Sequence, residues 1–361
     1  MANRAVSRVL GHAARAVDRA VVSAMQMRNK GERARAESLG HDDRVRLLGA
    51  IAGSYADAEG DPSRFFPDPP AIDPRPSFVR ALGARRPHKG ELAGVYDLAW
   101  ESGYEPFLGD VRERYLSRTH NRTAHARVYL AGAARPAIVL VHGYMGGQWA
   151  LEERQWPLGW FFKRGLDVAL PVLPFHARRG DGRSPWLPSS DPRVTNEGFR
   201  QAMHDIRGLV GWLLARGAPA VGVMGMSLGG YTSSLLATVE PRLAFAAPMI
   251  PLASVADFAR DQGRLGDGDV ASAQHAALER ANWIVSPLAR PSLVPRERVV
   301  VVGAEHDRIT PIAHAERIAA HFGVPLVRFP GGHLLQIGRG EGFRAVGKML
   351  EDAGIMTRRP D

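Results

Sequence analysis

The residues best suited to chemistry lie around Ser227, in the run Gly225-Met226-Ser227-Leu228-Gly229. An apolar stretch, Ala220–Met226, leads into this run, and a helical pattern, Gly229–Thr238, follows it. On a sharp turn between a strand and a helix, a serine projects its hydroxyl above the sheet, and small glycines on both sides avoid a collision across the turn. The first N–H groups of the helix favour developing negative charge. The pattern predicts a nucleophile rather than a turn that merely contains a serine.

Two further runs offer an acid and a base, in the chain order Ser, Asp, His. The apolar stretch Val299–Val302 precedes Asp307, and Pro311 then opens a predicted helix. Glu305 is an alternative acid, which its spacing to Pro311 disfavours. After a last predicted strand, Gly331-Gly332-His333 places a histidine on a flexible turn. A histidine held by a carboxylate activates a serine by removing its proton.

A glycine-rich loop follows the apolar strand Ala137–His142 and begins His142-Gly143-Tyr144-Met145-Gly146-Gly147. Backbone N–H groups of such a loop stabilise an oxyanion without a charged side chain. His142 is a second candidate for the base, but its position at the start of the loop favours a role in organising it.

These four runs, in this order, resemble those of the α/β-hydrolase superfamily, and the resemblance covers about residues 92–355. It implies the triad Ser227, Asp307 and His333, an oxyanion hole formed by the N–H groups of Tyr144 and Leu228, and supporting roles for His142, Gly143, Gly225 and Gly229. The implied reaction is hydrolysis of a small-molecule carboxylic ester through an acyl-enzyme on Ser227, with no metal or organic cofactor. An amidase or peptidase, a thioesterase and an acyltransferase use the same constellation. A non-catalytic binding scaffold with the same fold is the alternative of another class.

Other polar residues are less specific. His176, Arg178 and Arg179 follow the fourth predicted strand of the domain, and either contact an anionic substrate or anchor their loop to backbone carbonyls, with anchoring favoured. We treat Met145, His176 and Arg179 as candidate substrate contacts. His314 and His321 share a predicted helix face, but no third ligand suggests a metal site.

The elements that must position these residues alternate along the chain. Near-continuous apolar strands separated by helices predict an α/β fold: a mostly parallel, doubly wound sheet with helices on both faces. The first two strands have no crossover helix between them, which favours antiparallel pairing at one edge. The expected strands are Gly94–Trp100, Thr123–Leu130, Ala137–His142, Asp167–Leu173, Ala220–Met226, Leu243–Met249, Val299–Val302 and Pro325–Phe329; the expected helices are Glu197–Ala215, Gly229–Thr238, Ala313–His321 and Gly342–Ala353.

The pattern predicts a helical N-terminal extension over 1–60, a Pro-rich connector over 61–91 and a catalytic domain over 92–355. Residues 251–298 form an insertion after the sixth strand, expected to fold over Ser227 as a lid and to favour small acyl groups. All four catalytic runs lie beyond residue 135, so we expect residues 1–40 to be dispensable for hydrolysis of small esters.

An apolar stripe on the extension contains Val6, Val9, Leu10, Ala13, Val17, Val21 and Met25. Such a stripe packs on its own domain or on a second copy of the chain, which allows a homo-oligomer; a membrane surface is the less favoured partner.

The composition limits the remaining functions. The chain has no cysteine, which excludes disulfides and thiolate chemistry, and its net charge is +10. The basic residues are spread along the chain without interleaved aromatics, so no nucleic-acid partner is expected. Neither an export signal nor a membrane span is evident, and a cytoplasmic location is the expectation.

Overall fold

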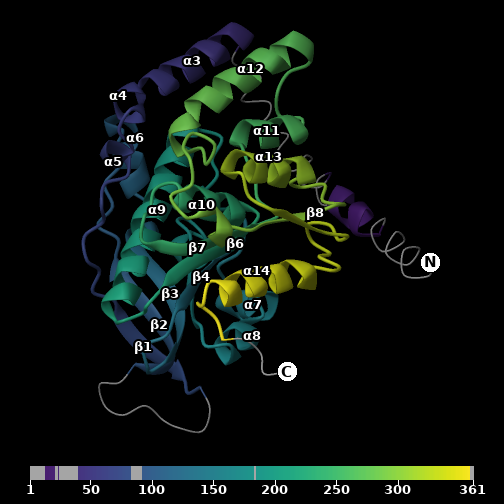
Figure 1. Cartoon of the computed structure of the whole chain (residues 1–361). Coiled ribbons are helices and arrows are strands. Elements are labelled where there is room, and N and C mark those ends of the chain that lie inside the picture. The colour runs from purple at the N-terminus through teal and green to yellow at the C-terminus, as the bar shows by residue number, and fades with distance from the viewer. Residues whose placement is uncertain (1–12, 21–22, 24–39, 83–91, 183, 358–361) are drawn as a thin grey trace, which may run out of the picture.

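The computed structural model describes residues 13–20, 23, 40–82, 92–182 and 184–357. Within them the chain forms a nine-stranded sheet with the order β1-β2-β3-β5-β4-β6-β7-β8-β9 (Figure 1). The strands are β1 (Arg75–Arg80), β2 (Ala93–Glu101), β3 (Thr123–Ala131), β4 (Ala137–Val141), β5 (Asp167–Pro171), β6 (Val221–Met226), β7 (Leu243–Met249), β8 (Val301–Ala304) and β9 (Leu326–Phe329).

The sheet is antiparallel at one edge and parallel through the rest. Pairing is antiparallel between neighbours in the order β1-β2-β3-β5. It is parallel between neighbours in the order β5-β4-β6-β7-β8-β9. The expected α/β sheet and its antiparallel edge are therefore confirmed. Carboxyl ends of parallel strands meet at one edge of a sheet, and β6, β8 and β9 carry the three triad candidates just beyond those ends.

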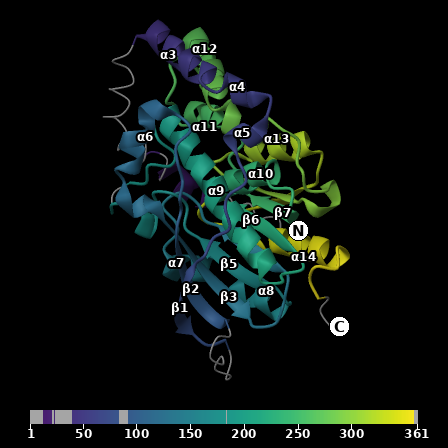
Figure 2. The ribbon, with the colours of Figure 1, turned by 90° about the vertical axis from the view of Figure 1, so that its left-hand side faces the viewer.

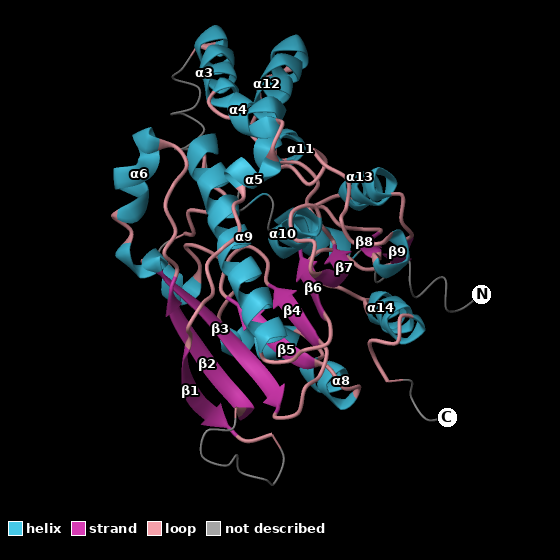
Figure 3. Ribbon diagram, turned by 60° about the vertical axis from the view of Figure 1, so that its left-hand side comes forward, coloured by secondary structure: helices cyan, strands magenta, loops and turns pink. Residues whose placement is uncertain are grey.

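Two helical layers cover the sheet and enclose two separate cores. On one face lie α9 (Pro192–Ala215), α10 (Leu228–Ala237) and α13 (Ile312–Phe322). On the other lie α7 (Trp149–Gln155), α8 (Leu158–Lys163) and α14 (Gly340–Asp352); Figure 1 labels all three, and Figure 3 shows α8 and α14 on this side, with α9 on the first face. Adjacent residues of one strand serve both cores: Val139 faces the first and Leu140 the second. This explains why the central strands read as unbroken apolar runs.

The first strand lies where a connector was expected. All six residues of β1 are exposed, and its partner is β2. A fully exposed edge strand shows no apolar alternation, and Pro76 argues against a strand in the sequence, so β1 was missed. The boundary at residue 92 is too late, because the sheet already begins at Arg75.

The N-terminal extension packs on the insertion rather than standing apart. The extension contains α3 (His41–Gly53) and α4 (Ala56–Glu59), and α5 (Pro62–Phe65) follows at the start of the expected connector; the insertion contains α11 (Val255–Asp261) and α12 (Gly268–Ala281). α3 and α12 lie side by side away from the sheet (Figure 2). Nη1 of Arg44 donates to Oε1 of Gln274 at 3.0 Å, and Leu48 and Ile51 are buried in the first core. α12 is thus a partner of α3.

Every helix of the described residues is too short or too polar to cross a bilayer. The structure also corrects the phase of the predicted apolar stripe. Residues 13–20 are helical, and their buried residues are Ala14 and Asp18, whereas Ala13 and Val17 of the stripe are exposed. The other stripe residues, Val6, Val9, Leu10, Val21 and Met25, lie outside the described residues.

Candidate functional site

Ser227 occupies a strained turn between β6 and α10. Its backbone has φ 58° and ψ −115°, a conformation that residues with a side chain rarely adopt. A Cβ on Gly225 would lie 2.0 Å from the carbonyl oxygen of Gly229, and one on Gly229 would lie 2.1 Å from that of Val141. Both positions therefore require glycine. Helix α10 begins at Leu228, so the N–H of Leu228 is among those without a partner inside the helix.

The glycine-rich loop that follows β4 lies directly against this turn. A Cβ on Gly143 would be 3.5 Å from Cβ of Ser227, which brings the start of the loop beside Ser227. The N–H of Gly146 donates to the carbonyl of Gly143 at 3.0 Å, and Met145 within this turn has φ 62°. Tyr144 and Met145 are exposed beside Ser227, Met145 by 55%. The structure thus brings together the two backbone segments that the resemblance assigns to an oxyanion hole.

His142 stabilises the loop through both of its ring nitrogens. Nδ1 donates to the carbonyl of Gly143 at 2.7 Å, and Nε2 accepts the N–H of Leu173 at 3.0 Å. Burial lowers the pKa of His142, which keeps the ring neutral in this arrangement. With both nitrogens engaged by the backbone, His142 is not available as the base.

Asp307 and His333 form a buried pair. Nδ1 of His333 donates to Oδ2 of Asp307 at 2.7 Å, which leaves Nε2 as the nitrogen that can take a proton. Oδ1 of Asp307 accepts the N–H groups of Ile309 and Thr310, both at 2.8 Å. Burial alone lowers the pKa of His333, but the negative charges of Asp307 and Asp18 outweigh it and raise that pKa above its usual value. Glu305 is exposed, so the pair involves Asp307.

Two contacts fix this pair beside the nucleophile. The N–H of Ser227 donates to the carbonyl of Met249, and the next carbonyl, that of Ile250, accepts the hydroxyl of Thr310 at 3.2 Å. Nε2 of Gln336 contacts the sulfur of Met226 at 3.5 Å and donates to the carbonyl of His333 at 3.1 Å. The loop of His333 therefore contacts the last residue of β6, and the loop of Asp307 contacts the residue after β7, next to the carbonyl that accepts from Ser227.

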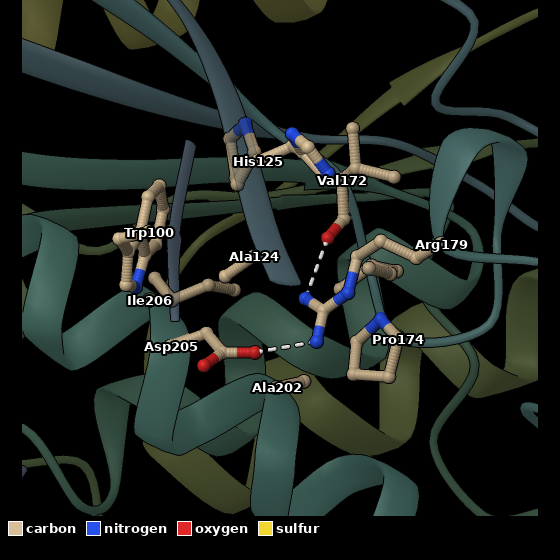
Figure 4. A pocket seen from close by; sticks show the side chains of 11 residues that line it. Trp100, Ala124, His125, Val172, Pro174, Arg179, Ala202, Asp205 and Ile206 are labelled. Carbon is tan, nitrogen blue, oxygen red and sulfur yellow. Dashed lines mark hydrogen bonds and ion pairs between the residues drawn. The ribbon is translucent and has the colours of Figure 1, made fainter. Parts of the chain in front are cut away.

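Two of the candidate substrate contacts are corrected by the structure. Arg179 is only 1% exposed and donates to the carbonyls of Val172 and Asn121 and to the carboxylate of Asp205 (Figure 4). His176 is fully buried, and its Nδ1 donates to the carbonyl of Pro174. Both residues anchor their loop, the alternative that the sequence favoured.

No group of His, Asp and Glu among the described residues is arranged to hold a metal ion. The two histidines of α13 have other partners. Nδ1 of His314 accepts the N–H of Ala253, and Nε2 of His321 donates to the carbonyl of Arg290.

Sequence reasoning missed three residues of this site: Asp18, Glu152 and Thr310. Thr310 had a signal, since an aspartate commonly binds backbone N–H groups two and three residues ahead. Glu152 and Asp18 had none, because each acts through a contact that folding creates. Oε1 of Glu152 accepts the N–H of Gly147 at 2.9 Å, and Asp18 binds the base loop 315 residues away.

Comparison with known proteins agrees with this fold. No protein-family model matches the chain. Two Mycobacterium tuberculosis proteins, the uncharacterized protein Rv2627c of strain H37Rv and the uncharacterized protein MT2702 of strain CDC 1551, are 31% identical over 304 residues, or 82% of this chain and 71% of theirs. An acetyl xylan esterase from Paenibacillus sp. R4 superposes with a TM-score of 0.54 at 16% identity, covering 82% of this chain and 94% of that one.

A second acetyl xylan esterase, from Thermoanaerobacterium, gives a TM-score of 0.51 at 19% identity over 82% of this chain and 93% of that one. The chain has the α/β-hydrolase fold, and it belongs to one family with the two mycobacterial proteins. Because the sheet has β1 in addition to the predicted strands, the predicted insertion follows the seventh strand, β7, and no longer the sixth.

Proposed function

We propose that this α/β-hydrolase is a serine hydrolase that cleaves carboxylic esters. His333 removes the hydroxyl proton of Ser227 through Nε2, and the serine oxygen attacks the acyl carbon. The N–H groups of Tyr144 and Leu228 stabilise the oxyanion, and Asp307 stabilises the imidazolium that forms. The alcohol leaves with the proton from His333. Water, activated by the same histidine, then releases the acid and restores the serine.

The observation that carries this proposal is the buried Asp307–His333 pair beside the strained turn of Ser227. Strain at a single non-glycine residue persists where the surrounding structure enforces it, and such positions concentrate at functional sites. A binding scaffold without catalysis has no need for a histidine whose Nδ1 proton is fixed by a carboxylate, with Nε2 kept for another partner.

The proposed mechanism applies to esters of many acyl groups. Two of the structural neighbours are acetyl xylan esterases, which makes acetyl esters the first class to test. An amidase, a thioesterase and an acyltransferase remain alternatives on the same triad. We favour hydrolysis over acyl transfer, because Ser227 is partly exposed and the loop beside it is exposed, so that water can reach an acyl group on the serine.

A fluorophosphonate probe and a panel of esters, amides and thioesters test the proposal. We expect stoichiometric labelling of the wild-type chain at Ser227, seen by intact mass and peptide mapping, and faster turnover of esters than of amides. Ser227→Ala should lose labelling and turnover. Ser233→Ala is the matched control, because its hydroxyl is buried in α10 and bonds only the carbonyl of Gly230. Labelling of the Ser227→Ala chain would place the nucleophile elsewhere.

A further inference from the structure

The helical residues 13–20 contact the triad loops through one buried carboxylate. Ala14 and Asp18, four residues apart, both have no exposed surface and form the inner face of this segment. It is drawn in purple beside β8 in Figure 1. The expectation that residues 1–40 are dispensable for hydrolysis of small esters did not take this contact of Asp18 into account.

Asp18 binds three backbone N–H groups on two different loops. Oδ2 accepts the N–H of His333 at 2.8 Å and that of Arg308 at 3.2 Å, and Oδ1 accepts the N–H of Leu334 at 3.1 Å. Arg308 directly follows Asp307. One carboxylate thus joins the loop of Asp307 to the loop of His333. It binds Arg308, the residue after Asp307, and it binds the backbone of His333 itself.

The base loop is shaped to admit this carboxylate. A Cβ on Gly332 would lie 2.7 Å from Oδ2 of Asp18 and 3.1 Å from Cβ of Ala14. Any side chain at position 332 would push the N-terminal helix away from the loop. The second glycine of Gly331-Gly332-His333 is therefore explained by Asp18.

The carboxylate also contributes charge. The charge of Asp18 raises the pKa of His333. The pKa of Arg308 is lowered by burial and by the charges of Arg15 and Arg19 on the same helix, and the charge of Asp18 opposes this. Asp307, which bonds Nδ1 of His333, carries the second negative charge. Asp18 is thus one of two acids that favour the protonated ring against the cost of burial.

We propose that Asp18 is a positioning residue of the active site, which holds the loops of Asp307 and His333 in register and makes the N-terminal segment part of the catalytic unit. The inference rests on the proposed function, because it assumes that His333 is the base. A misplacement of about 1 Å at a reacting group lowers a rate by about 100-fold, so a loop held by three hydrogen bonds bears directly on turnover.

Asp18→Asn and Asp18→Ala test this role, with Asp61→Asn as control. Asp61 is an exposed acid directly after the extension, and it likewise accepts a backbone N–H, that of Ser63. We expect both Asp18 variants to lower kcat and the fluorophosphonate labelling rate about 10- to 100-fold with little change in KM. The control should match the wild type. If Asp18→Ala fails to fold, Asp18→Asn keeps the shape and decides the result.

The pH profile separates a positioning role from general stability. Asp18 raises the pKa of His333, so a neutral residue at position 18 should move the acid limb of kcat/KM to lower pH. Arg15, Arg19 and Arg308 are unchanged in these variants, which assigns the shift to Asp18. A lower melting temperature with an unchanged rate per folded molecule and an unchanged acid limb would overturn the proposal.

A double-mutant cycle tests the contact itself. Gly332→Ala should lower turnover by crowding Asp18, and Gly340→Ala is its control, since a Cβ there meets nothing within 4 Å. The loss caused by Gly332→Ala should shrink in an Asp18→Ala background, where the contact at 2.7 Å is gone and only that with Cβ of Ala14 at 3.1 Å remains. Fully additive effects would overturn the contact. Failure of the wild type to label would instead refute the proposed function, which keeps the two outcomes distinct.

Discussion

The hydroxyl oxygen of Thr310 lies 3.0 Å from Nδ1 of His333 and 3.1 Å from Oδ2 of Asp307. Thr310 therefore touches both members of the buried pair, and the carbonyl of Ile250 lies 3.2 Å from the same hydroxyl. A hydroxyl in this position fixes the direction in which the carboxylate faces the imidazole.

Thr310→Val should lower kcat about tenfold and leave KM nearly unchanged, because valine keeps the shape of threonine and removes only the hydroxyl. Thr238→Val is the control, as its hydroxyl bonds the carbonyl of Leu235 at the end of α10. Steady-state kinetics on one ester, with melting temperatures of both variants, checks the expectation. A Thr310→Val enzyme at the wild-type rate would show that Asp307 needs no such support.

The pH dependence follows from the charges around His333. Asp307 and Asp18 raise its pKa above the ordinary value near 6.5, despite the opposing effect of burial. The base must be neutral to accept the proton of Ser227, so activity should persist at high pH and fall as the pH drops through this raised pKa. The acid limb of kcat/KM should have its midpoint above 6.5, with the fold intact across the range by circular dichroism. A midpoint below 6.5 would contradict this charge balance.

Glu152 holds the glycine-rich loop that follows β4. Oε1 accepts the N–H of Gly147 at 2.9 Å, and Oε2 accepts the indole N–H of Trp156 at 3.1 Å. Glu152→Gln leaves one acceptor for two buried donors, which costs about 1–3 kcal/mol of stability. We expect a lower melting temperature and a lower kcat, while Glu341→Gln, an exposed change in the first turn of α14, should have neither effect. A stable Glu152→Gln chain with full activity would show that the loop keeps its shape without the carboxylate.

The sequence predicted the core of the fold closely because its signal is local. Leu243–Met249 was predicted and observed as the same strand, since both faces of β7 are covered and its apolar run is unbroken. The strand expected at Val299–Val302 is found at Val301–Ala304, because Val299 makes only an isolated bridge to Ala246. Ladder pairing with β9, rather than apolar character, sets the limits of that strand.

The burial of Asp18 in the N-terminal region could not be predicted from local sequence in the same way. Periodicity assigned Ala13 and Val17 to the buried face of the first helix, whereas Asp18 is buried. A carboxylate can be buried once it accepts several N–H groups, and those groups belong to loops about 300 residues away. The helix phase was thus decided by a polar contact that only the folded chain contains.

The insertion after β7 is fastened to its surroundings by polar contacts. Asp257 of α11 pairs with Arg317 of α13, and Nε2 of Gln262 donates to the carbonyl of Ile309 in the acid loop at 3.4 Å. Oδ2 of Asp261 accepts from Nε2 of His314 at 3.1 Å. These contacts, together with the packing of α12 on α3, hold the insertion against the body of the molecule.

Because these contacts hold the insertion in place, we expect hydrolysis without interfacial activation. A lipase lid must swing away at a lipid surface, which here would break the contacts of α11 with α13 and of α12 with α3. We expect the rate on p-nitrophenyl esters to rise smoothly with concentration through the solubility limit, with acyl chains of about two to eight carbons preferred over longer ones. Arg317→Met removes the ion pair with Asp257. The rate should still rise smoothly with substrate concentration if α3 is enough to hold the insertion. It should jump at the solubility limit if the ion pair is the main restraint. A jump in the wild-type rate once substrate droplets form, together with a preference for long chains, would instead identify the insertion as a mobile lid.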